Sequence, residues 1–284
     1  MRKKILKSRW AVASLFATLA AATLLGAQAW HDTRADPLVR TVEVPLQGLP
    51  KSAPPLRIVL ISDVHVAGPD MPPSRLSRIV RQINTLNPDI VLLAGDLTSD
   101  KRTATRIYST EESAAPLAGL KARYGKVAVP GNHDYQRGID DVRTALEQVD
   151  FVVLQNDARK VGPVVVGGLD DDFTGHAALA TTLRAMDALP GPQILLSHSP
   201  DPFATLKPGH MLMLAGHTHC GQIAYPWGGS PATMSRYGQR YACGIVRENG
   251  NTLVVSAGLG TSLLPIRLFA SPDLWAIKAK PPGP

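Results

Sequence analysis

The sequence lacks the short motifs with which several large enzyme classes bind phosphate or attack esters. It contains neither G-x-G-x-x-G nor G-x-x-x-x-G-K, the glycine-rich loops that hold dinucleotides and nucleoside triphosphates. It also lacks G-x-S-x-G, the sharp turn that presents a nucleophilic serine. These absences argue against dinucleotide-dependent enzymes, P-loop enzymes and serine hydrolases.

Outside the N-terminus, basic residues hardly outnumber acidic residues. The formal net charge is +7, but the rest of the chain balances 25 basic against 23 acidic residues. It shows no basic stripe interleaved with aromatic residues, so we expect no nucleic-acid partner. Five of the 30 basic residues lie at the N-terminus: Arg2, Lys3, Lys4, Lys7 and Arg9.

No charged residue occurs from Trp10 to Trp30, a stretch of about the length that crosses a bilayer, with tryptophan at both ends. The basic cluster before it predicts a cytoplasmic N-terminus and a single-pass protein whose remaining chain lies on the outer side of the cell membrane. The small residues of Ala27-Gln28-Ala29 also fit a cleaved signal peptide, which would release a secreted or periplasmic protein. Both readings export the rest of the chain. The oligomeric state leaves no signal in the sequence.

Cysteine is scarce, with only Cys220 and Cys243. An oxidising compartment would allow the two to pair. Such a bridge would contribute roughly 3 kcal/mol to the free energy of unfolding. Two unpaired, buried cysteines are an equally acceptable reading of the sequence.

What the chain does contain is a repeated design, in which a short apolar strand ends in a side chain able to bind metal. In α/β sheets, active sites form at the carboxyl ends of the strands. Each example alone fits a turn acid, a helix cap or a core histidine, but five together favour one shared site. The five predicted strands and the motifs that follow them are 56–62 with Asp63-Val64-His65, 88–94 with Gly95-Asp96, 126–129 with Gly131-Asn132-His133-Asp134, 193–196 with Ser197-His198-Ser199, and 211–214 with Gly216-His217-Thr218-His219.

His217 and His219 are two residues apart just past a predicted strand, a spacing that points both imidazoles to one side. Between the strands, apolar residues at helical spacing predict helices near 74–86, 142–149 and 179–186. This alternation of strands and helices indicates an α/β fold with mixed sheets. The acidic run 170–172 follows a further apolar stretch and is expected to be a solvated loop, with contact to substrate or metal as the alternative.

Taken in order, these motifs resemble those of the calcineurin-like metallophosphoesterases, over about residues 56–277. Gly221-Gln222 and the segments 258–262 and 265–267 resemble a bacterial branch that is membrane-associated or exported. Cys220 departs from the pattern, because many relatives have glycine there. The resemblance implies a four-layer α/β/β/α sandwich over residues 56–284. It would follow a linker with a first strand, 31–55, and the N-terminal anchor or signal, 1–30.

The resemblance also implies a site for two divalent metal ions, with Asp96 bridging them. A set rich in imidazoles favours Mn, Zn or Fe over Mg or Ca. Ions about 3.5–4 Å apart clamp both oxygens of an in-line displacement and lower the pKa of bound water to about 7, so the nucleophile would be a bridging hydroxide. The implied ligands are Asp63, His65 and His219 for one ion and Asn132, His198 and His217 for the other.

His133 is left over from this ligand set, and the resemblance gives it a role at the leaving group. An ordinary histidine pKa of about 6.5 suits a general acid. Asp134 either orients the His133 imidazole or caps the following helix.

The sequence therefore predicts an exported, membrane-associated hydrolase of phosphate esters, with diesters favoured by family resemblance alone. One alternative enzyme is a pyrophosphatase that acts on sugar-nucleotide or lipid precursors at the cytoplasmic face of the membrane. Two alternatives without turnover are a catalytically silent metal-binding protein of the same fold and a membrane-tethered binding module.

Overall fold

The computed structural model describes residues 2–283, with side chains from residue 9 onward. Parts of the predicted N-terminal and C-terminal segments therefore lie outside the described residues or side chains: Met1, Arg2, Lys3, Lys4, Lys7 and Pro284.

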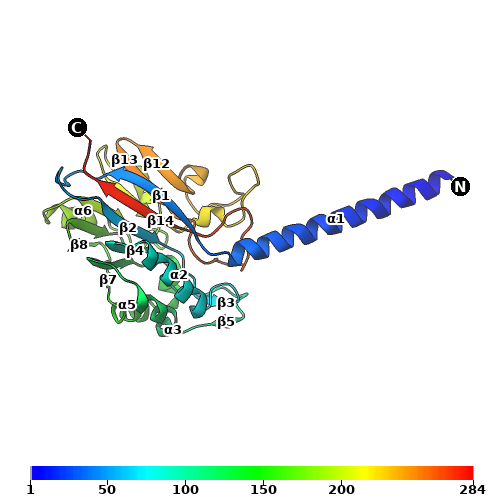
Figure 1. Ribbon diagram of the computed structural model, residues 1–284, viewed down its shortest axis with the longest axis horizontal. Coiled ribbons are helices and arrows are strands. Elements are labelled where there is room, and N and C mark those ends of the chain that lie inside the picture. The colour runs from blue at the N-terminus through cyan, green and yellow to red at the C-terminus, as the bar shows by residue number, and fades with distance from the viewer. Residues whose placement is uncertain (1, 284) are drawn as a thin grey trace.

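Two six-stranded sheets form the centre of the molecule (Figure 1). The first has the order β1 (Leu38–Pro45), β14 (Asp273–Lys280), β2 (Leu56–Ile61), β4 (Ile90–Ala94), β6 (Gly125–Val129) and β7 (Phe151–Val153). The second has the order β12 (Gly244–Glu248), β13 (Asn251–Val255), β11 (Leu212–Ala215), β10 (Gln193–Leu196), β9 (Val164–Gly168) and β8 (Asp157–Val161). Both sheets are mixed, since β14 runs antiparallel to β2, and β8 and β12 run antiparallel to their neighbours. A short pair, β3 (Ala67–Gly68) and β5 (Arg106–Ile107), lies outside the sheets.

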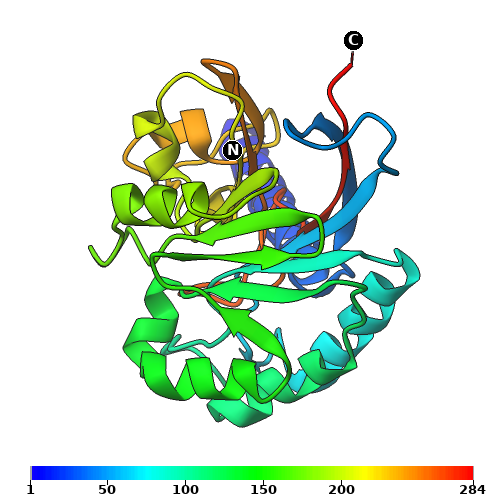
Figure 2. The ribbon, with the colours of Figure 1, turned by 90° about the vertical axis from the view of Figure 1, so that its left-hand side faces the viewer.

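Helices cover the outer face of each sheet, as Figure 2 shows in a view along the long axis. An apolar core from both sheets fills the space between them, including Ile58 and Leu92 of the first sheet and Ile194 and Leu214 of the second. A second core joins the first sheet to its helices, and a third joins the second sheet to α6, η2 and η4. The structure is therefore the predicted four-layer α/β/β/α sandwich. The covering elements are α2 (Pro73–Thr85), α3 (Thr110–Ala114), η1 (Ala115–Gly119) and α5 (Ile139–Glu147) on one side and α6 (Leu179–Asp187), η2 (Asp201–Thr205) and η4 (Gly238–Tyr241) on the other.

Local sequence explains these elements. Every residue of β4 is buried, as expected of a continuous apolar strand covered on both faces. In α2, Pro73 occupies the first turn, and an apolar stripe including Leu76 and Ile83 packs against the first sheet. The helix ends before Asn87, whose φ of 48° leaves the helical region, and Pro88 follows. The three predicted helices are thus confirmed, and each begins and ends within a few residues of its predicted boundaries.

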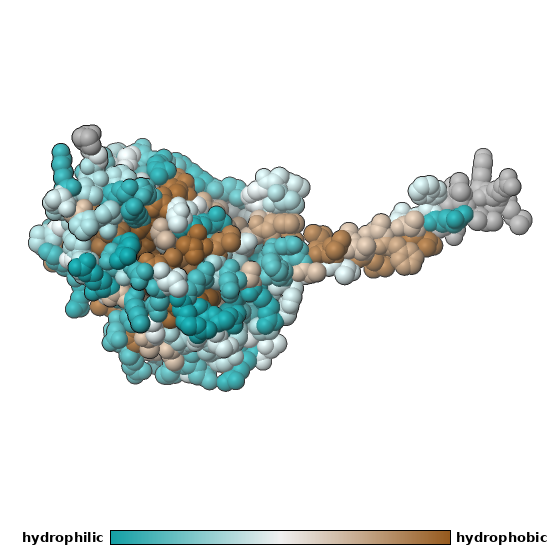
Figure 3. All heavy atoms as spheres, viewed as in Figure 1, coloured by the Kyte–Doolittle hydropathy of each residue, from teal (hydrophilic) through white to brown (hydrophobic). Residues whose placement is uncertain are grey.

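The helix α1 (Arg2–Arg34) projects away from the sandwich (Figure 1). Among the described residues, one stretch, Arg9–Arg34, is long and apolar enough to cross a membrane. Most of its surface is hydrophobic (Figure 3). This stretch is a candidate transmembrane or signal segment.

The C-terminal end of α1 is fixed to the sandwich by hydrogen bonds. The Thr33 hydroxyl oxygen accepts from the backbone N–H of Arg267 at 2.7 Å, and the Asp32 carboxylate accepts from that of Phe269 at 3.0 Å. The Arg75 guanidinium donates to the Thr33 and Ala35 carbonyls at 3.0 and 2.7 Å. The two Arg75 bonds satisfy backbone carbonyls at the C-terminal end of the helix, and the four bonds together tie this end to the sandwich.

Candidate metal centre

The carboxyl ends of five strands from both sheets open onto one place. Asp63 follows β2, Asp96 follows β4 and Asn132 follows β6 in the first sheet. His198 follows β10 and His217 follows β11 in the second sheet. Parallel strands present their carboxyl ends at the same edge, so this arrangement follows from the topology of the two sheets.

The backbone is left-handed at most of these positions. The φ angles are 50° at Asp63, 48° at His65, 56° at Asp96, 71° at His217 and 51° at His219. Few residues other than glycine adopt this conformation, and such residues concentrate at functional sites. Each turn bends the chain sharply away from its strand and directs the side chain toward the common centre.

His217 and His219 do not extend β11, because both lie in left-handed turns after the strand ends at Ala215. The alternating side-chain spacing of a strand therefore does not apply to them. Both imidazoles still reach the common centre, His219 beside His65 and His217 beside His198.

The first ligand group is formed by Asp63, His65 and His219, all buried. The Nε2 atoms of His65 and His219 are 3.1 Å apart, and Asp63 Oδ1 lies 3.4 Å from His219 Nε2. Asp96 Oδ2 lies 3.5 Å from His65 Nε2. Carboxylate and imidazole atoms at these distances can hold one cation between them.

The second ligand group is formed by Asn132, His198 and His217, also buried. His198 Nε2 lies 3.2 Å from Asn132 Oδ1 and 3.1 Å from His217 Nδ1. The same Asp96 Oδ2 lies 3.3 Å from His198 Nε2. Thus the structure brings all seven predicted ligands together, and one Asp96 oxygen lies between the two groups.

Hydrogen bonds to backbone carbonyls orient three of the four imidazoles. Nδ1 of His65 lies 3.2 Å from the Thr98 carbonyl, and Nδ1 of His198 lies 2.8 Å from the Ala94 carbonyl. Nε2 of His217 lies 3.2 Å from the carbonyl of Met234. A carbonyl only accepts, so these nitrogens carry protons. In His65 and His217, whose pKa values are held low by burial, the opposite nitrogens present lone pairs to the centre. This donor set fits a divalent transition ion, because carbonyl-bound imidazoles are the usual form of metal-ligating histidine.

Burial and the Asp96 carboxylate set the protonation of the four imidazoles. Burial holds the pKa of His65 and His219 well below the ordinary value, and burial together with His198 lowers the pKa of His217 to about 3. These three imidazoles are therefore neutral. Burial opposes protonation of His198 as well, but the Asp96 carboxylate outweighs it and raises the pKa of His198 well above the ordinary value.

Arg267 is a neighbour of this centre whose position the sequence did not predict. Its guanidinium is fully buried and lies 3.3 Å from His219 Nδ1. It donates to the carbonyls of Ala257 and Gly260 at 2.6 Å and of Ala270 at 3.0 Å. Burial lowers the pKa of Arg267 to about 10. In the sequence, Arg267 was marked only by its place in the segment 265–267, which resembles the bacterial branch of the family.

His133 is the least buried side chain of the centre, with 12% of its side chain exposed, and with His65 and Asp96 it forms a further group that could hold a metal ion. We call this partly exposed side of the centre its mouth. Its ring is 4.8 Å from that of His65, measured between centroids, in an edge-on arrangement. Its Nδ1 pairs with the Asp100 carboxylate, and its Nε2 lies 3.2 Å from the Ser262 hydroxyl oxygen. Asp100 therefore orients His133, a role that the sequence had offered to Asp134.

Asp134 is turned away from His133, so its predicted orienting role was wrong. Its buried carboxylate accepts from the backbone N–H groups of Asp96 at 2.8 Å, Gly131 at 3.1 Å and Thr98 at 3.1 Å, and from the Thr98 hydroxyl at 3.0 Å. Asp134 lies in the first turn of α4 (Asn132–Arg137) and caps this helix, which was the other role predicted for it. Burial and the nearby Asp96 raise the pKa of Asp134 to about 6.

The acidic run 170–172 is not the solvated loop that we expected. Asp170 is buried and accepts from the Tyr135 hydroxyl at 2.7 Å. Asp171 is also buried and accepts from the backbone N–H of Thr174 at 2.8 Å. Within the described residues these carboxylates belong to no group that could hold a metal ion, since their partners are protein donors.

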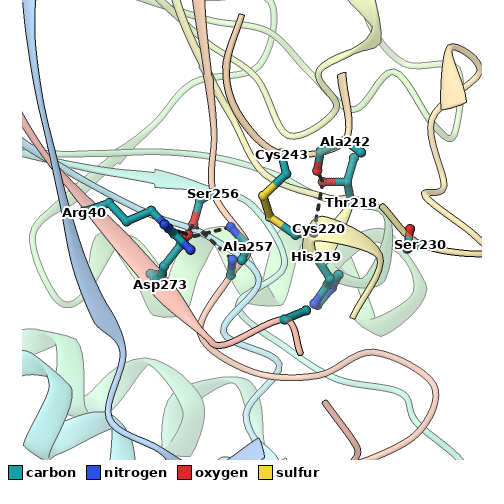
Figure 4. The surroundings of a disulfide bond; sticks show 12 residues. Arg40, Thr218, His219, Cys220, Ser230, Ala242, Cys243, Ser256, Ala257 and Asp273 are labelled. Atoms are coloured by element: carbon teal, nitrogen blue, oxygen red, sulfur yellow. Dashed lines mark hydrogen bonds and ion pairs between the residues drawn. A yellow bond between two sulfur atoms is a disulfide. The ribbon is translucent and has the colours of Figure 1, made fainter. Parts of the chain in front are cut away.

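Cys220 and Cys243 form a disulfide, which resolves the alternatives left open by the sequence (Figure 4). The bridge joins η3 (His219–Gly221) to the residue before β12, with the Cα atoms 4.8 Å apart. Beside it, the Thr218 hydroxyl donates to the Ala242 carbonyl at 2.6 Å (Figure 4). Two links therefore hold the segment that carries His219.

Comparisons with known proteins agree with this geometry. Residues 56–221 match the family of calcineurin-like phosphoesterases. The chain is 32% identical over 263 residues to the "Transmembrane protein with metallophosphoesterase domain" of Danio rerio, covering 86% of this chain and 57% of that protein. It is 30% identical over 260 residues to an uncharacterized metallophosphoesterase of Helicobacter pylori J99, covering 89% of this chain and 66% of that protein. The chain thus spans less than two thirds of the length of these curated relatives.

A third relative has nearly the same length. The uncharacterized metallophosphoesterase YkuE of Bacillus subtilis is 29% identical over 292 residues, covering 98% of this chain and 99% of that protein. Among solved structures, the 5'-nucleotidase precursor of Thermus thermophilus matches with a TM-score of 0.43 and 13% identity, over 79% of this chain and 55% of that chain.

Proposed function

This chain belongs to the calcineurin-like phosphoesterase family, and from that premise we propose that it hydrolyses phosphate esters, diesters in preference to monoesters, at a centre for two divalent ions. The proposal rests on one observation above all. A single oxygen of Asp96 lies within 3.5 Å of an imidazole nitrogen in each ligand group. A carboxylate in that position suits the bridge between two cations.

The ligand assignment we propose follows the two groups. Asp63, His65 and His219 would hold one ion, and Asn132, His198 and His217 the other. Four imidazoles among the donors favour Mn, Zn or Fe over Mg or Ca. When bound, such ions supply an acidified water and neutralise charge on the phosphate.

The remaining residues act on the substrate and on the ligands. His133, oriented by Asp100 at the mouth, donates a proton to the leaving-group oxygen as the ester bond breaks. Asp134 positions Asp96, because it accepts a hydrogen bond from the Asp96 backbone N–H. Turnover thus depends on His133, while the geometry of the bridging ligand depends on Asp134.

We propose three segments and one placement for the chain. Residues 1–30 form the anchor, residues 31–55 form the connection with the first strand, and residues 56–284 form the phosphoesterase domain. The basic residues before the uncharged stretch Trp10–Trp30 favour a cytoplasmic N-terminus, with the domain on the outer side of the cell membrane.

The first experiment is hydrolysis of a chromogenic phosphodiester and its monoester by the full chain in detergent. The protein is treated with a chelator, and Mn or Zn is then restored, with Asp96→Asn as the control. Turnover that requires metal and fails in Asp96→Asn supports the proposal, and the ratio of the two esters measures the substrate preference. Stoichiometric metal binding without turnover of either ester would favour the silent metal-binding protein instead.

A further inference from the structure

A group of large apolar side chains is exposed near the base of α1. Trp227 has 81% of its surface exposed and Leu263 has 69%, whereas residues of this kind are buried throughout the three cores. Exposed apolar side chains that gather on one surface mark an interaction site in a protein. We call this group the apolar rim: Ile223, Tyr225, Trp227, Leu263, Leu264 and Ile266.

Hydrogen bonds join the two loops of the apolar rim into one unit. The backbone N–H of Ala224 donates to the Leu268 carbonyl at 2.9 Å, and that of Leu268 donates to the Gln222 carbonyl at 3.0 Å. The Gln222 side-chain amide also donates to the Leu264 carbonyl at 3.0 Å. The two loops therefore move together.

The same unit is fixed to the end of α1. Arg267 and Phe269 donate their backbone N–H groups to Thr33 and Asp32, within three residues of Trp30. In Figure 1 both loops lie at the edge of the sandwich from which α1 projects. The apolar rim thus surrounds the point where the apolar surface of the helix begins.

The apolar rim also borders the mouth of the metal centre. Leu263 follows Ser262, whose hydroxyl oxygen lies 3.2 Å from His133 Nε2. The backbone N–H of Ser262 donates to the Gln222 side chain at 2.8 Å, so the rim loops position this part of the mouth. A surface that meets the apolar rim therefore also meets the entrance to the site.

We propose that the apolar rim inserts into the bilayer interface around α1, and that the substrate is the phosphate ester of a membrane lipid. Three observations favour lipid over a protein partner. The apolar rim continues the apolar surface of a helix long enough to cross a membrane. It combines aromatic and aliphatic side chains, the composition of interfacial anchors. At the base of the helix, the Arg34 guanidinium lies 4.7 Å from the ring centre of Trp30, a pairing suited to the headgroup region.

This placement sets what the site can reach. With α1 in the bilayer and the apolar rim at its surface, His133 and the metal centre lie beside lipid headgroups. A phosphate ester whose acyl chains stay in the bilayer can then enter without leaving the membrane. The substrate class rests on the proposed function, whereas insertion of the apolar rim does not.

The first test measures insertion alone, with the full chain reconstituted in phosphatidylcholine vesicles. Trp10→Phe and Trp30→Phe remove the tryptophans of α1 and leave Trp227 and the buried Trp275. Brominated phosphatidylcholine should then quench most of the Trp227 fluorescence, and adding Trp227→Phe should abolish the quenched signal. Emission that brominated lipid leaves unchanged would overturn the insertion.

The second test measures the substrate class in the same vesicles. Trp227→Asp with Tyr225→Asp should reduce turnover of a fluorogenic phospholipid diester at least about tenfold, because charge disfavours interfacial burial. The rate on a soluble chromogenic diester should stay within about twofold of the parent rate, since neither side chain reaches the ligand groups. Tyr124→Asp, an exposed aromatic position at the amino end of β6, serves as the matched control.

The outcomes separate the two proposals. Equal loss of both substrates in the double variant, or no loss of either, would overturn the lipid assignment. Metal-dependent turnover of the soluble ester without turnover of the lipid ester would overturn it as well. Absence of turnover on both substrates in the parent chain would refute the proposed function, while the fluorescence result would still decide the insertion.

Discussion

Replacing Cys220 and Cys243 together by serine tests how far the disulfide maintains both the fold and the site. The bridge joins residues 23 positions apart. Loss of loop-closure entropy in the unfolded chain at that length stabilises the fold by about 3 kcal/mol. At roughly 2–4 °C per kcal/mol for a chain of this size, Tm should fall by about 6–12 °C.

The same change should weaken the first ligand group more than the second. Cys220 directly follows His219, and both residues hold left-handed conformations that the bridge helps to fix. Without it, hydrogen bonds such as that from Thr218 to Ala242 still hold this turn, but no covalent link does. We expect the double variant to bind less metal at subsaturating concentrations and to retain the second ligand group.

Thermal unfolding and metal content measure the two effects separately. Tm should be recorded with and without chelator, because bound metal stabilises the folded state by mass action and would obscure the contribution of the bridge. Wild-type protein under reducing conditions is the matched control and should behave like the double variant. A Tm unchanged in chelator would refute the entropic argument, and unchanged metal affinity would refute the coupling to His219.

Three further predictions follow from the site. His133→Ala should retain its metal but lose about 10²–10⁴-fold in turnover, as expected of a general acid, and the turnover of Asp100→Asn should lie between that of His133→Ala and that of wild type. Metal analysis and a diester assay measure these effects, and full activity of His133→Ala would contradict the assignment. Asp134→Asn should lower the free energy of unfolding by about 2–4 kcal/mol, since two of the four buried donors lose their acceptor. It should also weaken metal binding. A denaturant unfolding curve that matches wild type would contradict the predicted loss of stability. Arg267→Lys should destabilise the fold by about 3–5 kcal/mol, because an ammonium cannot replace a forked guanidinium among several carbonyls; an unchanged Tm would contradict that.

The sequence predicted the strands that lead into the site but not the strand that completes the first sheet. β4 and β11 are short apolar runs followed by turn residues, so periodicity and composition identify them locally. β14 alternates lysine with apolar residues, and its pairing with β2 joins Trp275 to Leu60, far apart in the chain. No local pattern specifies such a partner, and only the folded chain reveals it.

In the site, the residue types were predictable and their directions were not. Strand ends rich in Asp, Asn and His identified the ligand candidates. Adjacency in the sequence identified the wrong partner for Asp134, which faces backbone donors because it lies in the first turn of a helix. His217 and His219 reach the centre through left-handed turns after β11, which the strand spacing did not predict. Asp100 reaches His133 across 33 positions of sequence, a contact that depends on the packing of loops.

The place of β14 also bears on when the protein becomes active during its synthesis. β14 lies between β1 and β2, and the Asp273 carboxylate at its start accepts from the Ala257 backbone N–H at 2.8 Å. The segment beyond Ala257 reaches the centre, where the Gly260 backbone N–H donates to the Asp63 carbonyl at 2.8 Å. A nascent chain that has emerged only as far as β13 therefore has an open first sheet and an unsupported Asp63 turn. The proposed hydrolysis would therefore wait for residues 273–280, so the order of translation would delay it until this strand has been made.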